Sequence, residues 1–357
     1  MLVSGLSGFK GQWLGRWLEK LGANVVGFGL APHLGPRGEA ISFPASLQCE
    51  MLDIRDHAAV CQFTRAAEPD VVMHLAAQPL VRQSYSDPLG TFATNIMGLA
   101  HLLDAATQCQ ARVFLNVTTD KCYENRETLR HYREEDALGG YDPYSASKAC
   151  SEIVTSAWRR SFSSDTGMLI ATARAGNVIG GGDWSDDRLI PDIVRSIAAN
   201  QSVVIRRPQA VRPWQHVLEA LSGYLLITGA MLAGEADKAS AWNFGPSETN
   251  SIPVGQIAQE MVAAWGAGKL EIASKLEGPH EAHLLQLDSS KAHTQLGWRA
   301  LLSPQERVTW TANWYRDWLA NPTRHWSLID NQIERYDARL RSTLEQSTAK
   351  GFQHVAA

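Results

Sequence analysis

Residues 5–11 read GLSGFKG, with glycines three and six positions apart directly before a segment of helical periodicity. Gly5 permits a tight turn, Gly8 lets backbone amides approach a phosphate, and Gly11 lets the following helix pack closely on the preceding strand. The N-terminus of that helix would present unpaired N–H groups and a positive dipole to an anion. The stretch therefore predicts a loop that binds the pyrophosphate of a dinucleotide.

Around this loop the chain alternates between short apolar runs and amphipathic helices. Four residues precede Gly5, so the first strand is expected to be short. A β-α-β rhythm favours a parallel sheet with helices on both faces, and the predicted fold class is α/β, a Rossmann-type doubly wound parallel sheet. Further strands are expected at 24–28, 47–52, 70–75 and 113–117, and helices at about 13–21, 56–67 and 87–109.

The second half of the chain loses this rhythm from about Val178, where loop-like glycine, proline, tryptophan and arginine become frequent. Trp310, Trp314 and Trp318 are four residues apart and are expected to pack against the body of the protein rather than stack on a ligand. The predicted division is a dinucleotide-binding domain at 1–177 with a return segment near 211–246, a smaller C-terminal substrate-binding lobe mainly at 178–330, and a helical tail at 331–357.

The composition of the 357 residues is that of an ordinary globular protein, with 45% hydrophobic and 20% charged residues. The net charge of -4 gives no reason to expect a nucleic acid or an anionic membrane as partner. No apolar run reaches transmembrane length, and the N-terminus lacks the pattern of a signal peptide. The five cysteines are scattered and never spaced Cys-x-x-Cys, which favours reduced thiols in a cytoplasmic enzyme.

The histidines give weaker signals. His280, Glu281 and His283 lack the i, i+4 spacing of a zinc site, so no metal is expected, and a structural role or a place in the substrate lobe is favoured. His74, at a predicted strand end, is expected to be a hydrogen-bonded core residue. The role of His216 stays open.

Tyr144 and Lys148 are the first catalytic candidates. Their i, i+4 spacing at the start of a predicted helix places phenol and ammonium on one helical face. A neighbouring ammonium favours phenolate, so the pKa of Tyr144 is expected to fall far enough for this residue to accept a proton near neutral pH. The alternative interpretation is a chance pairing on a helix face.

Thr119, Asp120 and Lys121 are the second set of candidates, because they follow the predicted buried strand 113–117 and should lie at its carboxyl end. An acid and an amine at a strand end, beside the phenol and ammonium of the first set, would form a proton-transfer site. The alternative interpretation of Asp120 and Lys121 is a surface ion pair, worth about 0–1 kcal/mol.

The end of the second predicted strand leaves the cofactor type open. An acidic residue there commonly binds the adenosine ribose and selects NAD over NADP, but residues 29–32 read GLAP. Asp53, after the third predicted strand, is expected to bond to the adenine amino group instead.

Arg188, Arg206 and Arg212 allow two interpretations. They form a solvated basic face, or they recognise the diphosphate and nucleoside of a substrate, because guanidinium binds phosphate oxygens through paired N–H donors. Arg212 is the strongest candidate of the three, and Asn177 is expected to reach the diphosphate as well.

Several longer strings resemble the extended short-chain dehydrogenase/reductase family, and within it the branch of nucleotide-sugar 4,6-dehydratases that acts on CDP-glucose. The similarity runs from residue 4 to about residue 318, and the later strings are far more specific than the glycine loop. The strings are SGFKG (7–11), DIRD (53–56), HLAAQPLVR (74–82), TDKCYEN (119–125), GGYDPYSASK (139–148), RAGNVIGGGDW (174–184) and VRPWQHV (211–217).

The resemblance implies a mechanism with NAD as cofactor. NAD takes a hydride from sugar C4 while Tyr144, aided by Lys148 and Thr119, removes the proton of the 4-hydroxyl. A base then removes the C5 proton, an acid protonates the departing C6 hydroxyl, and the hydride returns to C6. The product is a 4-keto-6-deoxy sugar for deoxysugar and polysaccharide biosynthesis. Asp120 and Lys121 stand where the dTDP-glucose enzymes have Asp-Glu, and are assigned as the C6 acid and the C5 base.

The resemblance also implies the binding residues and a homodimer or homotetramer. Dimerisation is expected through a four-helix core formed by helices at 91–109 and 145–160 of each copy. The expected cofactor-binding residues are Gly5, Ser7, Gly8, Phe9, Lys10, Gly11, Asp53, Ile54, Leu75, Ala76, Ala77, Gln78, Asn95, Val117, Tyr144 and Lys148. The expected substrate-binding residues are Arg82, Asn177, Arg188, Leu189, Arg206, Arg212 and His280.

Two other functions fit parts of the pattern. A sugar-nucleotide 4-epimerase or C4 reductase would share the glycine loop, Tyr144 and Lys148, but would have no need of an acid/base pair after the fifth strand. A catalytically silent dinucleotide-binding protein would usually lack the tyrosine or the lysine, and both are present.

Overall fold

A parallel sheet of seven strands forms the centre of the molecule, in the order β11-β6-β5-β4-β1-β2-β3. The computed structural model describes residues 1–32, 35–36, 38–246, 252–273 and 284–355, with side-chain burial described as far as residue 343. The strand order reverses between β1 and β4, so the predicted doubly wound α/β fold is confirmed. The strands are β1 (Leu2–Ser4), β2 (Val26–Gly29), β3 (Gln48–Met51), β4 (Val71–His74), β5 (Val113–Val117), β6 (Leu169–Ala175) and β11 (Ala241–Phe244).

Strand β1 is short, as predicted, and yet it lies in the middle of the sheet. All three of its residues are buried, and they pair with β2 on one side and with β4 on the other. The ammonium of Met1 donates a hydrogen bond of 2.7 Å to the carbonyl of Asn24, next to β2. Two neighbouring strands therefore hold the short strand in register.

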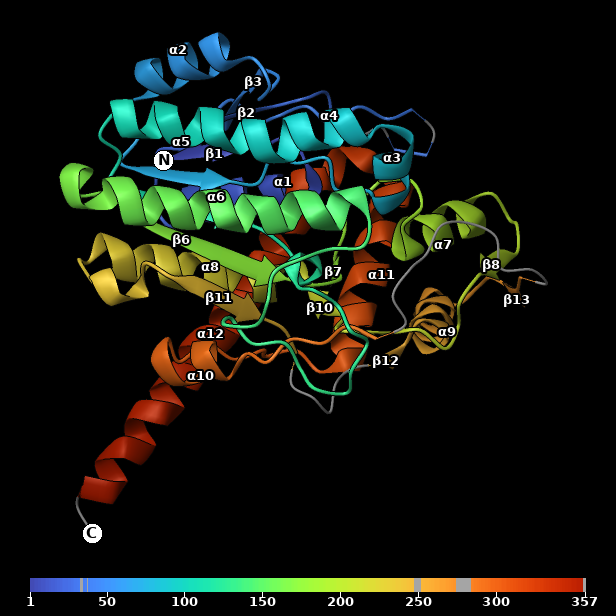
Figure 1. Ribbon diagram of the computed structural model, residues 1–357. Coiled ribbons are helices and arrows are strands. Elements are labelled where there is room, and N and C mark those ends of the chain that lie inside the picture. Colours follow the sequence, from blue (N-terminus) through green and yellow to red (C-terminus); the bar gives the residue numbers. More distant parts are fainter. Residues whose placement is uncertain (33–34, 37, 247–251, 274–283, 356–357) are drawn as a thin grey trace.

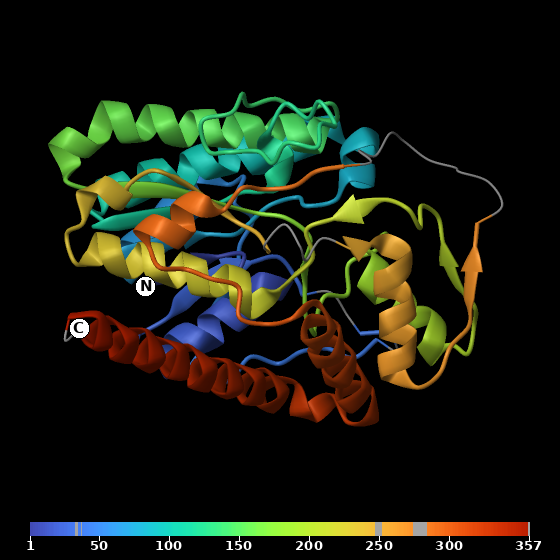
Figure 2. The same ribbon diagram turned by 90° about the horizontal axis from the view of Figure 1, so that it is seen from below.

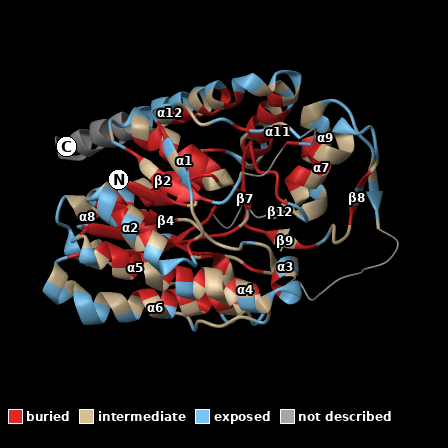
Figure 3. Ribbon diagram, turned by 90° about the horizontal axis from the view of Figure 1, so that it is seen from above, coloured by how far each residue is buried: buried red, intermediate tan, exposed pale blue. Residues whose placement is uncertain are grey.

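Helices cover both faces of the sheet (Figure 1). α2 and α5 pack on each other on one face, with α6 beside α5, while α1, α8 and α12 lie on the other face, where α12 runs along α1 (Figure 2). Burial follows these layers, with the inner strands of the sheet buried, the edge strand β3 largely exposed, and the outer helix surfaces exposed (Figure 3). These helices are α1 (Phe9–Lys20), α2 (His57–Ala67), α5 (Gly98–Gln108), α6 (Pro143–Thr166), α8 (Val217–Leu232) and α12 (His325–Val355).

The helix predicted at 87–109 is present as one helical stretch that contains a π turn. It begins as α4 (Pro88–Phe92), widens into the π segment η1 (Ala93–Met97) and continues as α5. A short helix, α3 (Val81–Ser86), precedes it. A π turn inserts one extra residue into a helix and is frequent at functional sites.

The glycine loop has the geometry that its sequence predicts. Gly5 has a φ of +73°, in the region that favours glycine. A Cβ atom at Gly11 would lie 2.1 Å from the carbonyl oxygen of Gly5, so any side chain there would push α1 away from β1. Gly11 thus lets the N-terminus of α1 sit against the end of the first strand.

A smaller lobe lies beyond the carboxyl ends of the sheet strands (Figure 1). The chain returns from it through β10 and α8 to the sheet at β11, within the predicted return segment 211–246, whereas the domain limits themselves stay a prediction. Elements of the lobe and its approaches are β7 (Val178–Ile179), α7 (Leu189–Ala198), β8 (Val203–Ile205), β9 (Val211–Arg212), β10 (Gln215–His216), β12 (Ile252–Pro253), α9 (Val254–Trp265) and β13 (Leu270–Ile272).

The C-terminal part packs back on the main domain. Trp310, Trp314 and Trp318 are all buried, which confirms that they are packing residues. Arg16 of α1 forms an ion pair of 2.7 Å with Asp330 of α12. Among the described helices, none combines the length and the apolar composition needed to cross a membrane. The remaining elements are η2 (Asp120–Cys122), η3 (Ala236–Lys238), α10 (Ser290–Gln295), α11 (Pro304–Ala320) and η5 (Pro322–Arg324).

Candidate active site

A cleft of about 1560 Å³ lies between the carboxyl ends of the strands and the smaller lobe. The glycine loop lines one end, the residues after β4 and β5 line the middle, and the lobe closes the other side. The cleft brings together all five catalytic candidates and nearly all binding candidates. The predicted residues that line it are Gly5, Ser7, Gly8, Phe9, Lys10, Gly11, Asp53, Ile54, Leu75, Ala76, Ala77, Gln78, Arg82, Val117, Thr119, Asp120, Lys121, Tyr144, Lys148, Asn177, Arg188, Leu189, Arg206 and Arg212.

Thr119 and Asp120 occupy the end of β5. Thr119 caps the short turn η2, and its hydroxyl donates a hydrogen bond of 2.9 Å to Oδ1 of Asp120. Asp120 is 1% exposed, and its Oδ2 has no hydrogen-bond partner among the described residues. The carboxyl group is therefore fixed through one oxygen, while the other is available to a ligand. Lys121 follows directly and lines the same cleft.

Tyr144 lies in the first turn of α6, next to these residues. Asp142 caps the helix by accepting a hydrogen bond of 2.9 Å from the backbone N–H of Ser145. Burial raises the pKa of Tyr144 to about 12, although the charge of Arg188 and a hydrogen bond with Thr119 act in the opposite direction. The expectation that the pKa of Tyr144 is lowered is therefore wrong for the protein alone. The effect of burial is larger than the opposing effects of Arg188 and Thr119.

Lys148 lies one turn further along α6. Its Nζ donates a hydrogen bond of 3.3 Å to the carbonyl of Val117 at the end of β5. Burial lowers the pKa of Lys148 to about 8, and the charge of Glu152 limits this shift. The ammonium form therefore predominates at pH 7, in a position fixed by the strand that also carries Thr119.

Beneath the catalytic residues lies a buried ion pair that sequence reasoning missed. Nη2 of Arg174, on β6, donates a hydrogen bond of 2.8 Å to Oε2 of Glu152, on α6, and the two side chains are 4% and 3% exposed. Glu152 also accepts hydrogen bonds of 2.5 Å and 2.8 Å from the hydroxyls of Thr118 and Thr172. The carboxylate thus connects α6 to β5 and β6. An available signal was its position four residues after Lys148, on the same helix face.

Positive charge gathers at the glycine-loop end of the cleft. Burial, together with the charges of Arg188 and Lys148, lowers the pKa of Lys10 to about 7, although Asp120 and Asp183 act in the opposite direction. Such a cluster of cations attracts an anionic ligand. Lys10 therefore contributes more than spacing to the glycine loop, because it adds a charge that changes near neutral pH.

The adenosine end of the predicted cofactor site has the acidic residue at β3 and none at β2. β2 ends at Gly29, and residues 30–32 line the cleft without a carboxylate. Asp53, after β3, pairs with Arg55 at 2.6 Å, and this hydrogen bond lowers its pKa. Its predicted contact with adenine stays a prediction.

Asn95 is the one described cofactor candidate that does not line the cleft. It lies in the π turn, where its Oδ1 accepts a hydrogen bond of 2.8 Å from the N–H of Gln78 and its Nδ2 donates one of 3.0 Å to the carbonyl of Gln78. Nδ2 also donates to the hydroxyl of Ser147, on α6, at 2.8 Å. Asn95 thus positions the loop after β4, rather than facing the cleft itself.

Arginines line the lobe side of the cleft. Arg82 and Arg206 both pair with Asp187, at 3.3 Å and 3.2 Å, and sequence reasoning missed this shared carboxylate. Nη2 of Arg188 donates a hydrogen bond of 3.3 Å to the carbonyl of Pro79. Arg212 is 8% exposed, so the interpretation as a solvated basic face is wrong for this residue. The arrangement offers several guanidinium groups to an anion.

The histidines take no part in the described site. Nδ1 of His74 lies 2.7 Å from the hydroxyl of Ser4, which confirms a hydrogen-bonded core residue, and His216 caps the N-terminus of α8. Burial lowers the pKa of each to about 3, so both are neutral at pH 7. The candidates His280, Glu281 and His283 lie outside the described residues.

The fold and the cleft define an α/β protein with a dinucleotide-type glycine loop and a Tyr-x-x-x-Lys pair beside a strand-end acid. The model of the GDP-mannose 4,6 dehydratase family matches residues 2–310, and the chain belongs to this family. A CDP-glucose 4,6-dehydratase of Salmonella typhimurium is 44% identical over 326 residues, which cover 89% of this chain and 91% of the relative. A dTDP-glucose 4,6-dehydratase of Escherichia coli is 25% identical and covers 88% of this chain and 92% of its own length.

Solved structures show the same fold at lower identity. DesIV, a dTDP-glucose 4,6-dehydratase from Streptomyces venezuelae with NAD bound, superposes with a TM-score of 0.75 at 23% identity, over 91% of this chain and 98% of that one. A UDP-glucose 4-epimerase from Thermus thermophilus in complex with NAD also gives a TM-score of 0.75, at 22% identity, over 88% and 98% of the two chains. Fold likeness alone therefore does not separate dehydratase from epimerase.

Proposed function

We propose that the protein is an NAD-dependent CDP-glucose 4,6-dehydratase, a hydro-lyase that forms CDP-4-keto-6-deoxyglucose. The observation that carries this proposal is the presence of a second acid/base pair, Asp120 and Lys121, in the same cleft as Tyr144 and Lys148. An epimerase or C4 reductase needs only Tyr144 and Lys148, whereas elimination of water across C5 and C6 needs both pairs. The 44% identity with a CDP-glucose 4,6-dehydratase supports the same substrate.

The residues at the glycine loop fit NAD. Gly5 turns the chain, and Gly11 lets the N-terminus of α1 reach the edge of the cleft with its unpaired N–H groups. Lys10 adds a cation beside this anion site, and Asp53 and Ile54 lie at the adenosine end. When bound, NAD supplies the acceptor and donor of a hydride, so that the overall reaction involves no net oxidation.

Tyr144 acts as the base at the 4-hydroxyl of the sugar. Its phenol has to lose a proton, and a raised pKa works against this until positive charge is close by. Lys148 and Arg188 supply such charge in the cleft, and Thr119 holds the phenol through a hydrogen bond. The three residues thus favour the phenolate form, which then accepts the proton from the hydroxyl.

Asp120 and Lys121 act at the far carbons of the sugar. We assign Asp120 as the acid that protonates the departing C6 hydroxyl, because its Oδ2 is free of other hydrogen bonds among the described residues. Lys121 is assigned as the base at C5, which requires its neutral form. The test is Lys121→Met, assayed for exchange of the C5 hydrogen with deuterated solvent. Undiminished exchange would mean that another residue is the base.

The substrate diphosphate is bound by arginines of the lobe side. Arg82, Arg188 and Arg206 line the cleft, and Arg212 and Asn177 line it as well. Guanidinium groups bind phosphate oxygens through paired donors, and Asp187 orients two of them. Leu189, at the start of α7, contributes apolar surface to the same wall.

The decisive assay is incubation of the purified protein with CDP-glucose, dTDP-glucose and GDP-mannose in separate reactions. We expect the alkali-induced chromophore of a 4-ketosugar with CDP-glucose alone. A chromophore with another nucleotide sugar would change the substrate but keep the reaction. Conversion of a nucleotide sugar to its C4 epimer, without any chromophore, would contradict the dehydratase proposal.

We further infer a homodimer through the outer face of α4, α5 and α6. This face exposes apolar side chains, among them Leu89 at 80%, Met97 at 52% and Ile153 at 56%. An apolar surface of this kind, on neighbouring helices, is typical of a contact between subunits. Ile153→Asp is expected to shift the mass measured by light scattering towards the monomer, and Val204→Asp, exposed on the lobe, is the control. An unchanged mass in both variants contradicts this dimer.

A further inference from the structure

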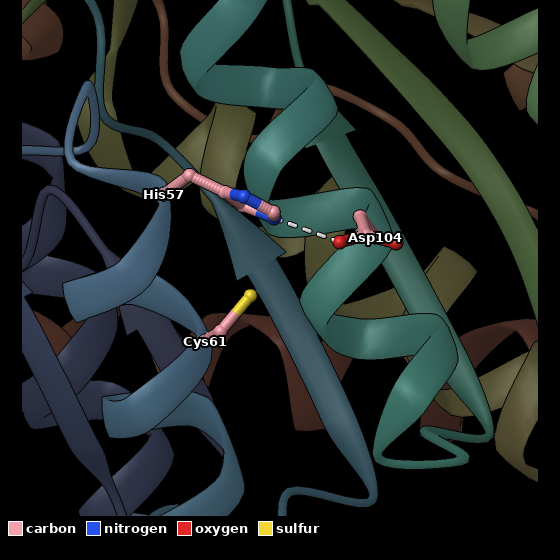
Figure 4. A group of neighbouring side chains, drawn as sticks. All are labelled: His57, Cys61 and Asp104. Carbon is pink, nitrogen blue, oxygen red and sulfur yellow. Dashed lines mark hydrogen bonds and ion pairs between the residues drawn. The ribbon is translucent and has the colours of Figure 1, made fainter.

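A cluster of metal-ligand side chains lies on the outer seam between α2 and α5, apart from the cleft (Figure 4). His57 and Cys61 are one turn apart on α2, so both face α5, where Asp104 faces them. The nitrogen, sulfur and oxygen ligand atoms of the three residues all lie within 4.8 Å of one another. Three different ligand types therefore converge on one point from two helices.

The hydrogen bonds around the cluster fix its orientation. Nε2 of His57 lies 2.8 Å from Oδ2 of Asp104, and Gln108 donates to the same Oδ2 at 2.8 Å. The neighbouring ring of His101 lies with its centroid 4.9 Å from that of His57, and its Nδ1 is 3.1 Å from the carbonyl of Ile54. A carbonyl accepts only from a protonated nitrogen, so this contact places a hydrogen on Nδ1 of His101. Such second contacts commonly hold histidines for metal binding.

The geometry is close to that of a tetrahedral site. Zinc is bound at about 2.0–2.1 Å by histidine nitrogen, about 2.3 Å by thiolate and about 2.0–2.2 Å by carboxylate, so neighbouring ligand atoms stand roughly 3.3–3.7 Å apart. Nε2 of His57 and Oδ2 of Asp104 are 2.8 Å apart, and all ligand atoms lie within 4.8 Å of one another, a range that includes the separations expected around zinc. Rotations of exposed side chains are sufficient to close the difference.

We propose that His57, Cys61 and Asp104 form a binding site for one divalent transition-metal ion, of which Zn²⁺ is the biological candidate, with solvent completing the coordination. Three mixed ligands with an open position suit Zn²⁺ and Co²⁺ and disfavour Mg²⁺ and Ca²⁺, which prefer oxygen ligands alone. The side chains of His57 and Asp104 are 50% and 36% exposed, so an ion can reach the site from solvent.

This site goes beyond the proposed dehydration and does not depend on it. None of the three ligands lines the active-site cleft. No metal was expected from the sequence, because the ligands come from two helices that are about forty residues apart and so form no compact motif. An ion here would join α2 to α5 directly behind the loop at Asp53 and Ile54.

The test is a titration of the reduced full-length protein with Co²⁺, followed by absorption spectroscopy, and then displacement by Zn²⁺. A thiolate-to-cobalt charge-transfer band that saturates at one ion per chain is expected. Histidines elsewhere can bind Co²⁺ without this band, so the band identifies the site. Zn²⁺ is also expected to raise the Tm by about 3–4 °C when it is present at 100 times its Kd.

Variants assign the ligands. Cys61→Ser should abolish the charge-transfer band. His57→Gln and Asp104→Asn should each weaken Co²⁺ binding by at least the roughly 10–100-fold that follows loss of a residue hydrogen-bonded to a metal ligand. Cys49→Ser, another half-buried thiol on β3, is the matched control and should leave the band intact. Co²⁺ binding without a thiolate band in the wild type, or a band that survives Cys61→Ser, would overturn the proposal.

Discussion

The two walls of the active-site cleft are built in different ways. On the sheet side, Tyr144, Lys148 and Asp120 are buried and are held by hydrogen bonds to strand ends and by the buried pair of Glu152 and Arg174. On the other side, Arg82 and Arg206 are partly exposed and share a surface carboxylate, Asp187. The contrast teaches that the chemistry is placed where the fold is most constrained, whereas anion recognition is placed where side chains can adjust.

The largest expected effect concerns the sheet wall. Tyr144→Phe removes the proton acceptor but keeps the ring, so we expect kcat to fall by roughly 10²–10⁴-fold while Tm changes little. Steady-state kinetics with the alkali-induced chromophore measure the first quantity, and circular dichroism the second. Tyr141→Phe, an exposed tyrosine three residues earlier, is the control. A kcat within a few-fold of the wild type would remove Tyr144 from the mechanism.

The support beneath that wall gives the second prediction. Glu152→Gln leaves the Arg174 charge buried without its partner, and we expect the free energy of unfolding to fall by about 3–5 kcal/mol. Urea denaturation measures this loss. Glu306→Gln, in the partly exposed pair with Arg339, is the matched control and should cost about 0–1 kcal/mol. Equal losses in the two variants would contradict the distinction between buried and exposed pairs.

The lobe wall should respond in substrate binding. Arg212→Ala removes a charged donor from the cleft, so we expect the KM for the nucleotide sugar to rise about 10–150-fold, the equivalent of about 1.5–3 kcal/mol for a hydrogen bond to a charged group. The Kd for NAD, measured by fluorescence quenching, should change little. Arg316→Ala, on the exposed side of α11, serves as control. Parallel losses in KM and in NAD binding would indicate structural damage instead.

The smallest effect lies where the two walls meet, at Lys10. Its pKa of about 7 means that the side chain is protonated below this pH and neutral above it. An anionic ligand favours the protonated form, so above pH 7 binding must take up a proton, and affinity for NAD should fall by up to roughly tenfold per pH unit. Lys10→Gln should show a flatter profile from pH 6 to 8. Identical profiles for both proteins would exclude this role of Lys10.

Sequence reasoning reached the sheet, the glycine loop and the catalytic candidates because these follow from local patterns. The apolar run at 113–117 is β5 to the residue, and the i, i+4 pair of Tyr144 and Lys148 lies on one helix face in the cleft. The positions of such residues can be predicted from the sequence, because the carboxyl ends of the strands in a parallel sheet lie at one edge.

The depth of burial and the pairing of residues distant in the chain could not be predicted from the sequence. The pKa of Tyr144 rises because of its depth in the fold, which no spacing rule reports. Asp187 pairs with two arginines that are more than a hundred residues apart in the chain. Glu152 pairs with Arg174 because α6 packs on β6. Each of these depends on which elements become neighbours, and that information appears only at the level of tertiary structure.

The π turn at Ala93–Met97 has a consequence for ligand binding. Through it a single amide, that of Asn95, bonds both to Gln78 beside the cleft and to Ser147 in the helix that carries Tyr144 and Lys148. A ligand that displaces Gln78 must therefore alter the hydrogen bonding of that helix in the same step. Ligand binding in the nucleotide site and the position of Tyr144 are therefore expected to be thermodynamically linked. The link is the side chain of Asn95, which itself does not line the cleft.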